Sequence, residues 1–218
     1  NLGNLKIDEE SKHLVKEYYK NFEKAGANLT EGQKKEVKEI NSELASLSNE
    51  FGKKMLESQK NGGVTVSDKV QLKGFSEEKI KSIEKDGKYE IQLINTTQQP
   101  SLQALENREV REELFNKSIH RADAGEYDTS DLVKKMALLR AKKAKILGFD
   151  NYASWSLQGT MASTPDKVFE MFEGLIPGSL DKASSETKEI QEEINKNGGD
   201  FKLAAYDWNH YAEKVRKS

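Results

Sequence analysis

The segment TEGQKKEVKEINSELASLSNEFGKKMLESQKNGG, residues 30–63, decides the fold of this chain. Its large apolar side chains follow one another at steps of three and four residues, which places them on one stripe of a helix. They are Val37, Ile40, Leu44, Leu47, Phe51 and Met55. Thr30 with Gln33 three residues later predicts a capping box at the start, and the two glycines after Asn61 predict the end. The segment therefore predicts one long helix that packs through a single face.

Helical periodicity also dominates the rest of the chain. Before the long helix, Leu14, Tyr18 and Phe22 give one face to a helix that ends near Gly26. Beyond residue 100 we expect helices at 107–118, from Asp128 to Leu147-Gly148, from Asp150 through Tyr152 and Trp155, from Thr164-Pro165 to Asn197-Gly198-Gly199, and from about Asp207. Most of these starts carry a capping side chain, and two of the ends carry glycine, which suits helix termini.

Apolar stripes predict the buried side of these later helices. The inward residues are Val110, Leu114 and Phe115, then Leu132, Met136, Leu139 and Ile146, and then Val168, Phe172, Leu175, Leu180, Ala183, Thr187, Ile190 and Ile194. Pro177-Gly178 interrupts the last of these stripes. Because proline lacks a backbone donor and crowds the preceding turn, we expect a kink or a break in the helix there.

Between residues 64 and 100 the period changes from helical to alternating. Val64 and Val66, and Tyr89, Ile91 and Leu93 after an Asp-Gly turn, alternate with polar neighbours as half-buried strands do. Residues 76–85 between them predict a short helix. We therefore expect a mainly α fold with a small β-containing insertion around 64–95, organised as a long helical hairpin (1–63), the insertion (64–100) and a further helical region (101–218), joined in one structural unit.

Composition excludes several classes of function. Charged residues make up 33% of the chain and apolar ones 35%, with a mean hydropathy of −0.83, which suits amphipathic helices. The net charge of −2 gives no electrostatic basis for binding nucleic acid or an anionic membrane. No apolar run approaches the roughly 20 residues that span a bilayer. The chain opens on Asn1 without a signal-type segment, so we expect the natural N-terminus to lie upstream. We favour the cytoplasm, with the periplasm or secretion left open.

With no cysteine, a metal site would need histidine and carboxylate ligands, and three histidines are candidates. None belongs to a His-Glu-x-x-His motif. His13 with Glu17, and Asp207 with His210, have spacings that could share a metal, but no third ligand is indicated, so we interpret both as solvated pairs on helix surfaces. His120 has Arg121, Asp123, Glu126 and Asp128 nearby in the sequence, which favours a structural hydrogen bond.

Other kinds of site find no support. No glycine-rich phosphate loop and no Gly-x-Ser-x-Gly elbow is present. Tyr206, Trp208 and Tyr211 could line a cleft, although core packing is the more frequent use of such residues. We therefore assign no catalytic, cofactor-binding or metal-binding residue in this chain.

Several ordered motifs nevertheless resemble a known family. They are AGANLT (25–30), INSELASLSNEF (40–51), LLRAKKAKILGFDNYA (138–153), MASTP (161–165) and YDWNHYAEKVR (206–216). In order and spacing they resemble the peptidyl-dipeptidase, or dipeptidyl carboxypeptidase, branch of the thimet oligopeptidase family of zinc metallopeptidases. The motifs extend from about residue 20 to the end of the chain.

The resemblance implies a fold and an activity for a longer parent protein. Members similar to neurolysin and thimet oligopeptidase are helical, two-lobed zinc peptidases that enclose short peptides in a channel, and this branch removes dipeptides from the C-terminus. Their zinc motif and their catalytic Tyr and His lie downstream of the segment that resembles residues 206–216, so the resemblance transfers no catalytic residue to this chain.

The expected role therefore depends on partners outside the chain. The resemblance implies short peptide substrates, zinc held by the parent, and a catalytic domain of the same protein against which this segment forms part of the channel wall. Alone, we expect the segment to be inactive. The alternative is a stand-alone helical interaction module without enzymatic activity.

Overall fold

The computed structural model describes residues 7–218, apart from the side chains of residues 95–98. Two compact units can be described separately. Unit 1 comprises the described residues up to Asn49 together with Leu132–Gly174, and unit 2 comprises Glu50–Asp131 together with Leu175–Ser218. In the described part of the chain no helix is long and apolar enough to cross a membrane. The mainly α fold with a small sheet is confirmed.

Unit 1 is built on the predicted long helix. This helix, α2 (Glu31–Asn61), starts with the predicted capping box, because the Thr30 backbone donates to Gln33 at 3.1 Å and the Gln33 backbone donates to the Thr30 hydroxyl at 3.3 Å. Val37, Ile40 and Leu47 of its predicted stripe are buried. The predicted boundaries and inward face are thus confirmed.

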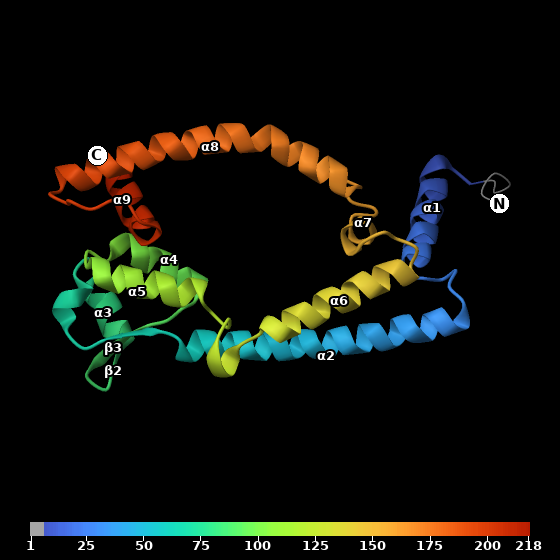
Figure 1. The fold of residues 1–218 in the computed structure, drawn as a ribbon, viewed down its shortest axis with the longest axis horizontal. Coiled ribbons are helices and arrows are strands. Elements are labelled where there is room, and N and C mark those ends of the chain that lie inside the picture. The colour runs from blue at the N-terminus through green and yellow to red at the C-terminus, as the bar shows by residue number, and fades with distance from the viewer. Residues whose placement is uncertain (1–6) are drawn as a thin grey trace. The chain divides into compact units, whose positions relative to one another are not determined.

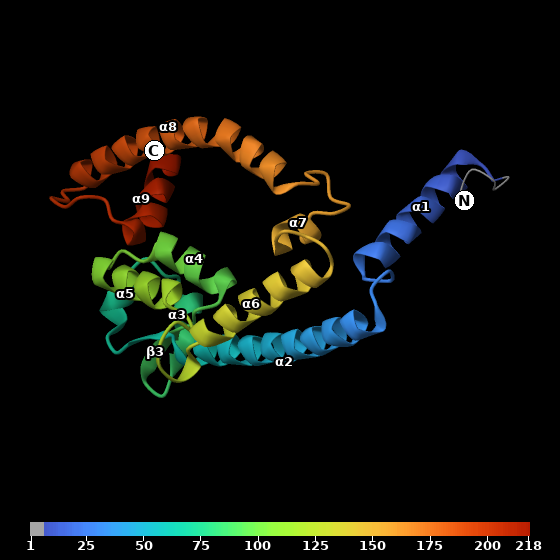
Figure 2. The ribbon, with the colours of Figure 1, turned by 45° about the vertical axis from the view of Figure 1, so that its right-hand side comes forward.

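Helix α6 (Ser130–Ile146) lies beside α2 in both views (Figures 1 and 2). Ion pairs join Glu36 to Lys142 at 2.7 Å and Glu43 to Lys135 at 2.6 Å. Residue numbers rise along one helix as they fall along the other, so the two helices are antiparallel. The start and end of α6 follow the prediction: the Asp128 carboxylate accepts from the Ser130 backbone at 2.8 Å, and Gly148 ends the helix with a φ of 84°.

Three further helices contribute to unit 1. Helix α1 (Glu9–Lys24) precedes α2, α7 (Tyr152–Ser156) follows α6, and α8 (Pro165–Lys196) begins in this unit. The predicted cap of α7 is wrong by one position, because Asn151 rather than Asp150 accepts from the Ser154 backbone, at 2.8 Å. Trp155 connects α7 to the end of α1, since its indole N–H donates to the Lys24 carbonyl at 3.0 Å.

Helix α8 continues through Pro177, so of the kink or break that we expected there, the break does not occur. Because proline has no backbone N–H, the carbonyl four residues before it receives no helical hydrogen bond. The side chains around Pro177 are exposed, so water can reach this carbonyl. Only Ile190 and Ile194 of the predicted stripe are buried, whereas Leu180, Ala183 and Thr187 are exposed. Gly198, with a φ of 79°, follows the end of α8 as predicted.

Unit 2 contains a three-stranded antiparallel sheet of order β1-β3-β2. Its strands are β1 (Val64–Val66), β2 (Glu84–Lys85) and β3 (Lys88–Ile91), and Val64 pairs with Ile91. The helix predicted at 76–85 ends earlier, as α3 (Glu77–Ile83), because Glu84–Lys85 pairs with β3 across the Asp-Gly turn. A 3-10 turn, η2 (Lys69–Leu72), follows β1.

Helices α4 (Asn95–Ala104) and α5 (Arg108–Ile119) bury the core of unit 2 against this sheet, and α9 (Ala205–Lys217) packs on both helices. A second 3-10 turn, η3 (Gly125–Tyr127), precedes α6. Buried apolar side chains unite the sheet, α3, α4 and α5: Val64, Val66, Leu72, Ile80, Ile91, Leu93, Leu102, Leu105, Val110 and Leu114. Helix α4 contains Pro100 and was not predicted. The packing of α9 on α4 and α5 creates the site described next.

Candidate functional site

Asp207 lies in the first turn of α9 and is completely buried. Arg108 donates to its carboxylate through Nε at 3.1 Å and Nη2 at 2.9 Å, and Arg111 donates through Nη2 at 2.9 Å. The backbone N–H of Ala204 adds a bond of 3.2 Å, which caps the start of α9. Both arginines belong to α5, so one carboxylate fixes α9 on α5 through charge-assisted bonds.

The electrostatics of this Asp207 cluster favour the charged form of the acid. Burial by itself would raise the pKa of Asp207, but the hydrogen bonds from Arg108 and Arg111 outweigh it and hold the pKa below its ordinary value. Arg111 is only 1% exposed, and its Nη1 donates to the carbonyls of Leu105 and Glu106, each at 2.9 Å. Its Nε is buried without a hydrogen-bond partner among the described residues. Asp207 is therefore the acid that pairs with the buried Arg111 guanidinium, at 2.9 Å.

Aromatic rings surround the same arginines. The guanidinium of Arg108 lies 4.0 Å from the ring centre of Phe201 and 4.8 Å from that of Tyr206. Tyr211 is buried with Ile190, Ile194 and, at its edge, Trp208. Core packing, the use that we favoured for Trp208 and Tyr211, is confirmed, and Tyr206 packs edge-on against Phe115.

His210 lies one turn after Asp207 and is 5% exposed. Its Nδ1 is 3.0 Å from the carbonyl oxygen of Gln103 in α4. Because a carbonyl can only accept, Nδ1 carries the proton and Nε2 holds a lone pair. Burial, helped by the positive charge of Arg111, lowers the pKa of His210 to about 4, so the ring is neutral near pH 7. The interpretation of Asp207 and His210 as a solvated pair is wrong, because α9 turns both toward α4 and α5.

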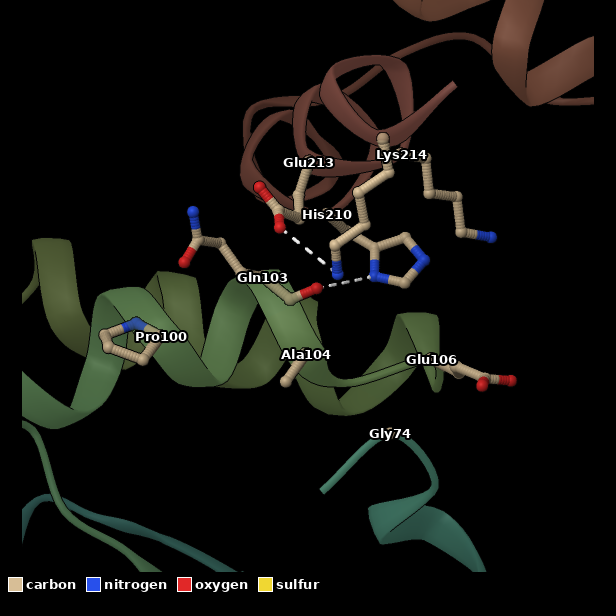
Figure 3. Close-up of a pocket in the computed structure, with 9 residues that line it drawn as sticks. Gly74, Pro100, Gln103, Ala104, Glu106, His210, Glu213 and Lys214 are labelled. Carbon is tan, nitrogen blue, oxygen red and sulfur yellow. Dashed lines mark hydrogen bonds and ion pairs between the residues drawn. The ribbon is translucent and has the colours of Figure 1, made fainter. Parts of the chain in front are cut away.

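A hollow of about 380 Å³ opens beside His210, between α9 and α4 (Figure 3). It is lined by Gly74, Pro100, Gln103, Ala104, Glu106, His210, Glu213, Lys214 and Lys217. Its two carboxylates already have partners. Glu106 forms an ion pair with Lys73 at 2.8 Å, and hydrogen bonds from Arg216 and Lys217 lower the pKa of Glu213 to about 2. Paired acids and a neutral imidazole offer no group poised for proton transfer near neutral pH.

The other two histidines do not line this hollow. His13 is exposed on α1, and its predicted neighbour Glu17 pairs instead with Lys20 at 2.7 Å. His120 follows the end of α5, where its Nδ1 lies 2.6 Å from Asp123, so it makes a local hydrogen bond as expected.

No three His, Cys, Asp or Glu side chains gather into a possible metal site among residues 7–218 as described. Asp207 and His210 come nearest in donor type, but they do not fit a zinc ion. The Asp207 carboxylate already accepts from two guanidinium groups and a backbone N–H, and His210 uses one nitrogen on Gln103. The contacts of Asp207 and His210 therefore hold α9 against α5 and α4.

Comparison with known proteins finds a family model and several relatives that match this chain. The family model described as Peptidase family M3 matches residues 101–218. The chain is 37% identical, over 98% of its length, to the dipeptidyl carboxypeptidases of Escherichia coli (strain K12) and of Salmonella typhimurium (strain LT2), and the match covers 32% of each relative. It is 25% identical, over 94% of its length, to oligopeptidase A of Haemophilus influenzae, again covering 32%.

This chain belongs to peptidase family M3. The resemblance to the thimet oligopeptidase family is thereby confirmed, and the higher identity to the dipeptidyl carboxypeptidases agrees with the branch that the motifs indicate. The chain spans about a third of the length of these curated relatives.

Proposed function

We propose that this chain is a non-catalytic segment of a zinc peptidyl-dipeptidase, an enzyme that removes dipeptides from the C-terminus of short peptides. The observation that carries the proposal is the 37% identity, over 98% of the chain, to proteins named dipeptidyl carboxypeptidase. Identity to proteins named oligopeptidase A is lower, at 24–25% for the bacterial ones. This difference favours the dipeptide-releasing branch.

The chemistry would reside in the part of the parent protein that this chain does not contain. The family resemblance implies zinc, but the described residues form no group that could hold it, and His210 and Asp207 are engaged in packing α9. Zinc would therefore be bound by other residues of the parent, and we assign no catalytic step to the side chains described above.

The role that remains for this segment is structural: it would form part of the wall of the substrate channel. Two features suit such a role. In unit 1 the long helices α2 and α6 lie antiparallel and are joined by two ion pairs. In unit 2 the Asp207 cluster fixes α9 on α5, so the YDWNHYAEKVR motif is held in a single orientation. A wall built on packed helices holds its shape better than one built on loops.

A chimera tests the proposal. The stretch of the Escherichia coli relative that matches this chain is replaced by residues 1–218, and release of a dipeptide from an N-terminally blocked tripeptide is measured with zinc present. We expect the chimera to release the dipeptide and a chelator to stop it, whereas the 218-residue chain alone has no turnover. A folded chimera without activity would contradict the peptidase assignment. Turnover by the purified chain alone, lost with a chelator, would show that catalysis lies within it.

The alternative, a stand-alone interaction module, makes a different prediction for the gene. A reading frame that continues beyond residue 218 into a His-Glu-x-x-His motif supports the peptidase segment. A natural stop codon directly after residue 218, with no activity in the chimera, would favour the module.

A further inference from the structure

Helix α1 buries none of its sixteen residues, although it carries five large apolar side chains. Leu14, Val15, Tyr18, Tyr19 and Phe22 are 42–64% exposed. We call these five residues the α1 face. They recur at steps of one, three and four residues, which gathers them on one side of the helix. A contiguous apolar side of this kind is uncommon on the free surface of a monomer and marks an interaction site.

The attachment of α1 leaves this face uncovered. The helix is joined to α7 at its C-terminal end, where Lys24 donates through Nζ to the carbonyls of Ser156 and Gln158, at 3.2 and 2.7 Å. Trp155 donates in return to the Lys24 carbonyl at 3.0 Å. These contacts hold the last turn of the helix and do not involve the α1 face, which is therefore presented by a helix that is fixed at one end.

Charge argues against a lipid surface as the occupant of the face. Helices that lie on membranes carry an excess of Lys and Arg, which draws them to anionic lipids. In α1 the four lysines are matched by four glutamates. Two ion pairs form, between Lys12 and Glu9 at 2.6 Å and between Lys20 and Glu17 at 2.7 Å. The helix therefore has no net attraction to an anionic surface, and an apolar protein surface fits it better.

We propose that the α1 face is the docking surface for an apolar helix of the same parent peptidase, from the part of that protein outside residues 1–218. The proposal rests on the proposed function. The match that covers 98% of this chain covers only 32% of the Escherichia coli relative, so about two thirds of such a protein is available to pack on it. A convex helix side suits another helix, whose ridges fit its grooves, whereas short peptides bind in concave sites.

A matched pair of variants tests the docking. Tyr18→Glu places one negative charge in the α1 face, and His13→Glu places the same charge on the opposite, exposed side of the helix. Each is made in the chimera with the Escherichia coli relative and in the 218-residue chain. Hydrogen exchange of the α1 amides and the melting temperature are measured after circular dichroism has established that each protein is folded.

In the chimera we expect the α1 amides to exchange at least about tenfold more slowly than in the 218-residue chain. Tyr18→Glu should remove this protection and lower the melting temperature of the chimera, while His13→Glu changes neither. In the 218-residue chain neither variant should change the hydrogen exchange of α1 or the melting temperature. Equal exchange in the two proteins, together with a silent Tyr18→Glu in the chimera, overturns the docking proposal.

The outcomes separate this proposal from the proposed function. Dipeptide release with an unprotected α1 refutes the docking alone, and a protected α1 without dipeptide release refutes the peptidase assignment alone. Concentration-dependent dimers of the 218-residue chain with α1 protected, seen by light scattering, would identify a second copy as the occupant. Co-sedimentation with phosphatidylserine vesicles would identify a membrane, and either result overturns the proposal.

A second measurement applies if the chimera does not fold. The 218-residue chain is mixed with the separately produced remainder of the Escherichia coli relative, and their association is followed by sedimentation. Tyr18→Glu should weaken the association at least about tenfold, with His13→Glu as the control. Association that is equally strong with Tyr18→Glu, or absent with the unaltered chain, overturns the docking.

Discussion

Substitution of Asp207 by alanine tests whether the buried cluster holds α9 in place. Asp207→Ala removes the carboxylate that accepts from Arg108, from Arg111 and from the Ala204 backbone. Arg111 is 1% exposed, so its charge would remain buried without an anion. Removing one partner of a buried ion pair costs about 3–5 kcal/mol. We expect a loss of this size in the free energy of unfolding of unit 2, with Asp207→Asn in between because it keeps the volume and one acceptor oxygen.

The two tryptophans allow the units to be followed separately. Trp155 belongs to unit 1 and Trp208 to α9, so a Trp155→Phe background leaves Trp208 as the reporter of α9 during unfolding in urea. Glu77→Gln is the matched control, because it removes an exposed ion pair with Lys69 in the same unit. The control should leave the transition of Trp208 unchanged.

The difference in the free energy of unfolding between Asp207→Ala and the unaltered chain gives a second check through its pH dependence. The pKa of folded Asp207 lies below its ordinary value, so its stabilising contribution is complete above the unfolded-state pKa of about 3.9 and is lost as the pH falls through the folded-state pKa. The difference in the free energy of unfolding between Asp207→Ala and the unaltered chain should therefore be constant from about pH 5 to 8. A Trp208 transition at the same urea concentration in both proteins would refute the reasoning.

Four further substitutions test other parts of unit 2. His210→Phe should flatten the decline in stability between about pH 7 and 5, a decline on the order of 2 kcal/mol, because the unfolded chain protonates this imidazole near pH 6.5 while the folded one resists until about pH 4; urea unfolding at pH 7 and 5 measures it. Gly74→Ala should lower the melting temperature, because the new Cβ would lie 1.9 Å from the Ala104 carbonyl oxygen and the backbone φ of 102° disfavours any side chain. Gly52→Ala, in open space within α2, should instead raise stability by about 0.5–1 kcal/mol. Leu105→Ala should cost about 2–5 kcal/mol because the side chain is completely buried, and an unchanged urea midpoint would contradict this.

The helices were predictable wherever local chemistry decides them. The Thr30 capping box and the φ values near 80° at Gly148 and Gly198 depend on residues within one turn, so the sequence indicates them directly. Helix α4 was missed because its polar N-terminal half and Pro100 disfavour a helix locally. It forms because Leu102 and other side chains nearby are completely buried in the core of unit 2.

The Asp207 cluster was not predicted because it depends on contacts between residues about a hundred positions apart. Sequence patterns show Asp207 and His210 as a polar pair on a helix, and a polar pair is normally solvated. One signal was available: Arg111 lies between Val110 and Leu114, which were both predicted to face inward, and the structure buries all three. A charge in such a position requires a buried partner of opposite sign. The sequence does not say which acid that is.

Zinc binding by the 218-residue chain tests the central claim most directly. If the chain is a non-catalytic segment of a zinc peptidase, titration with zinc at neutral pH, followed by dialysis and metal analysis, should leave far less than one equivalent bound, while the chimera with the Escherichia coli relative retains zinc and releases dipeptides. One tightly held equivalent in the chain alone, accompanied by chelator-sensitive peptide hydrolysis, would contradict the account.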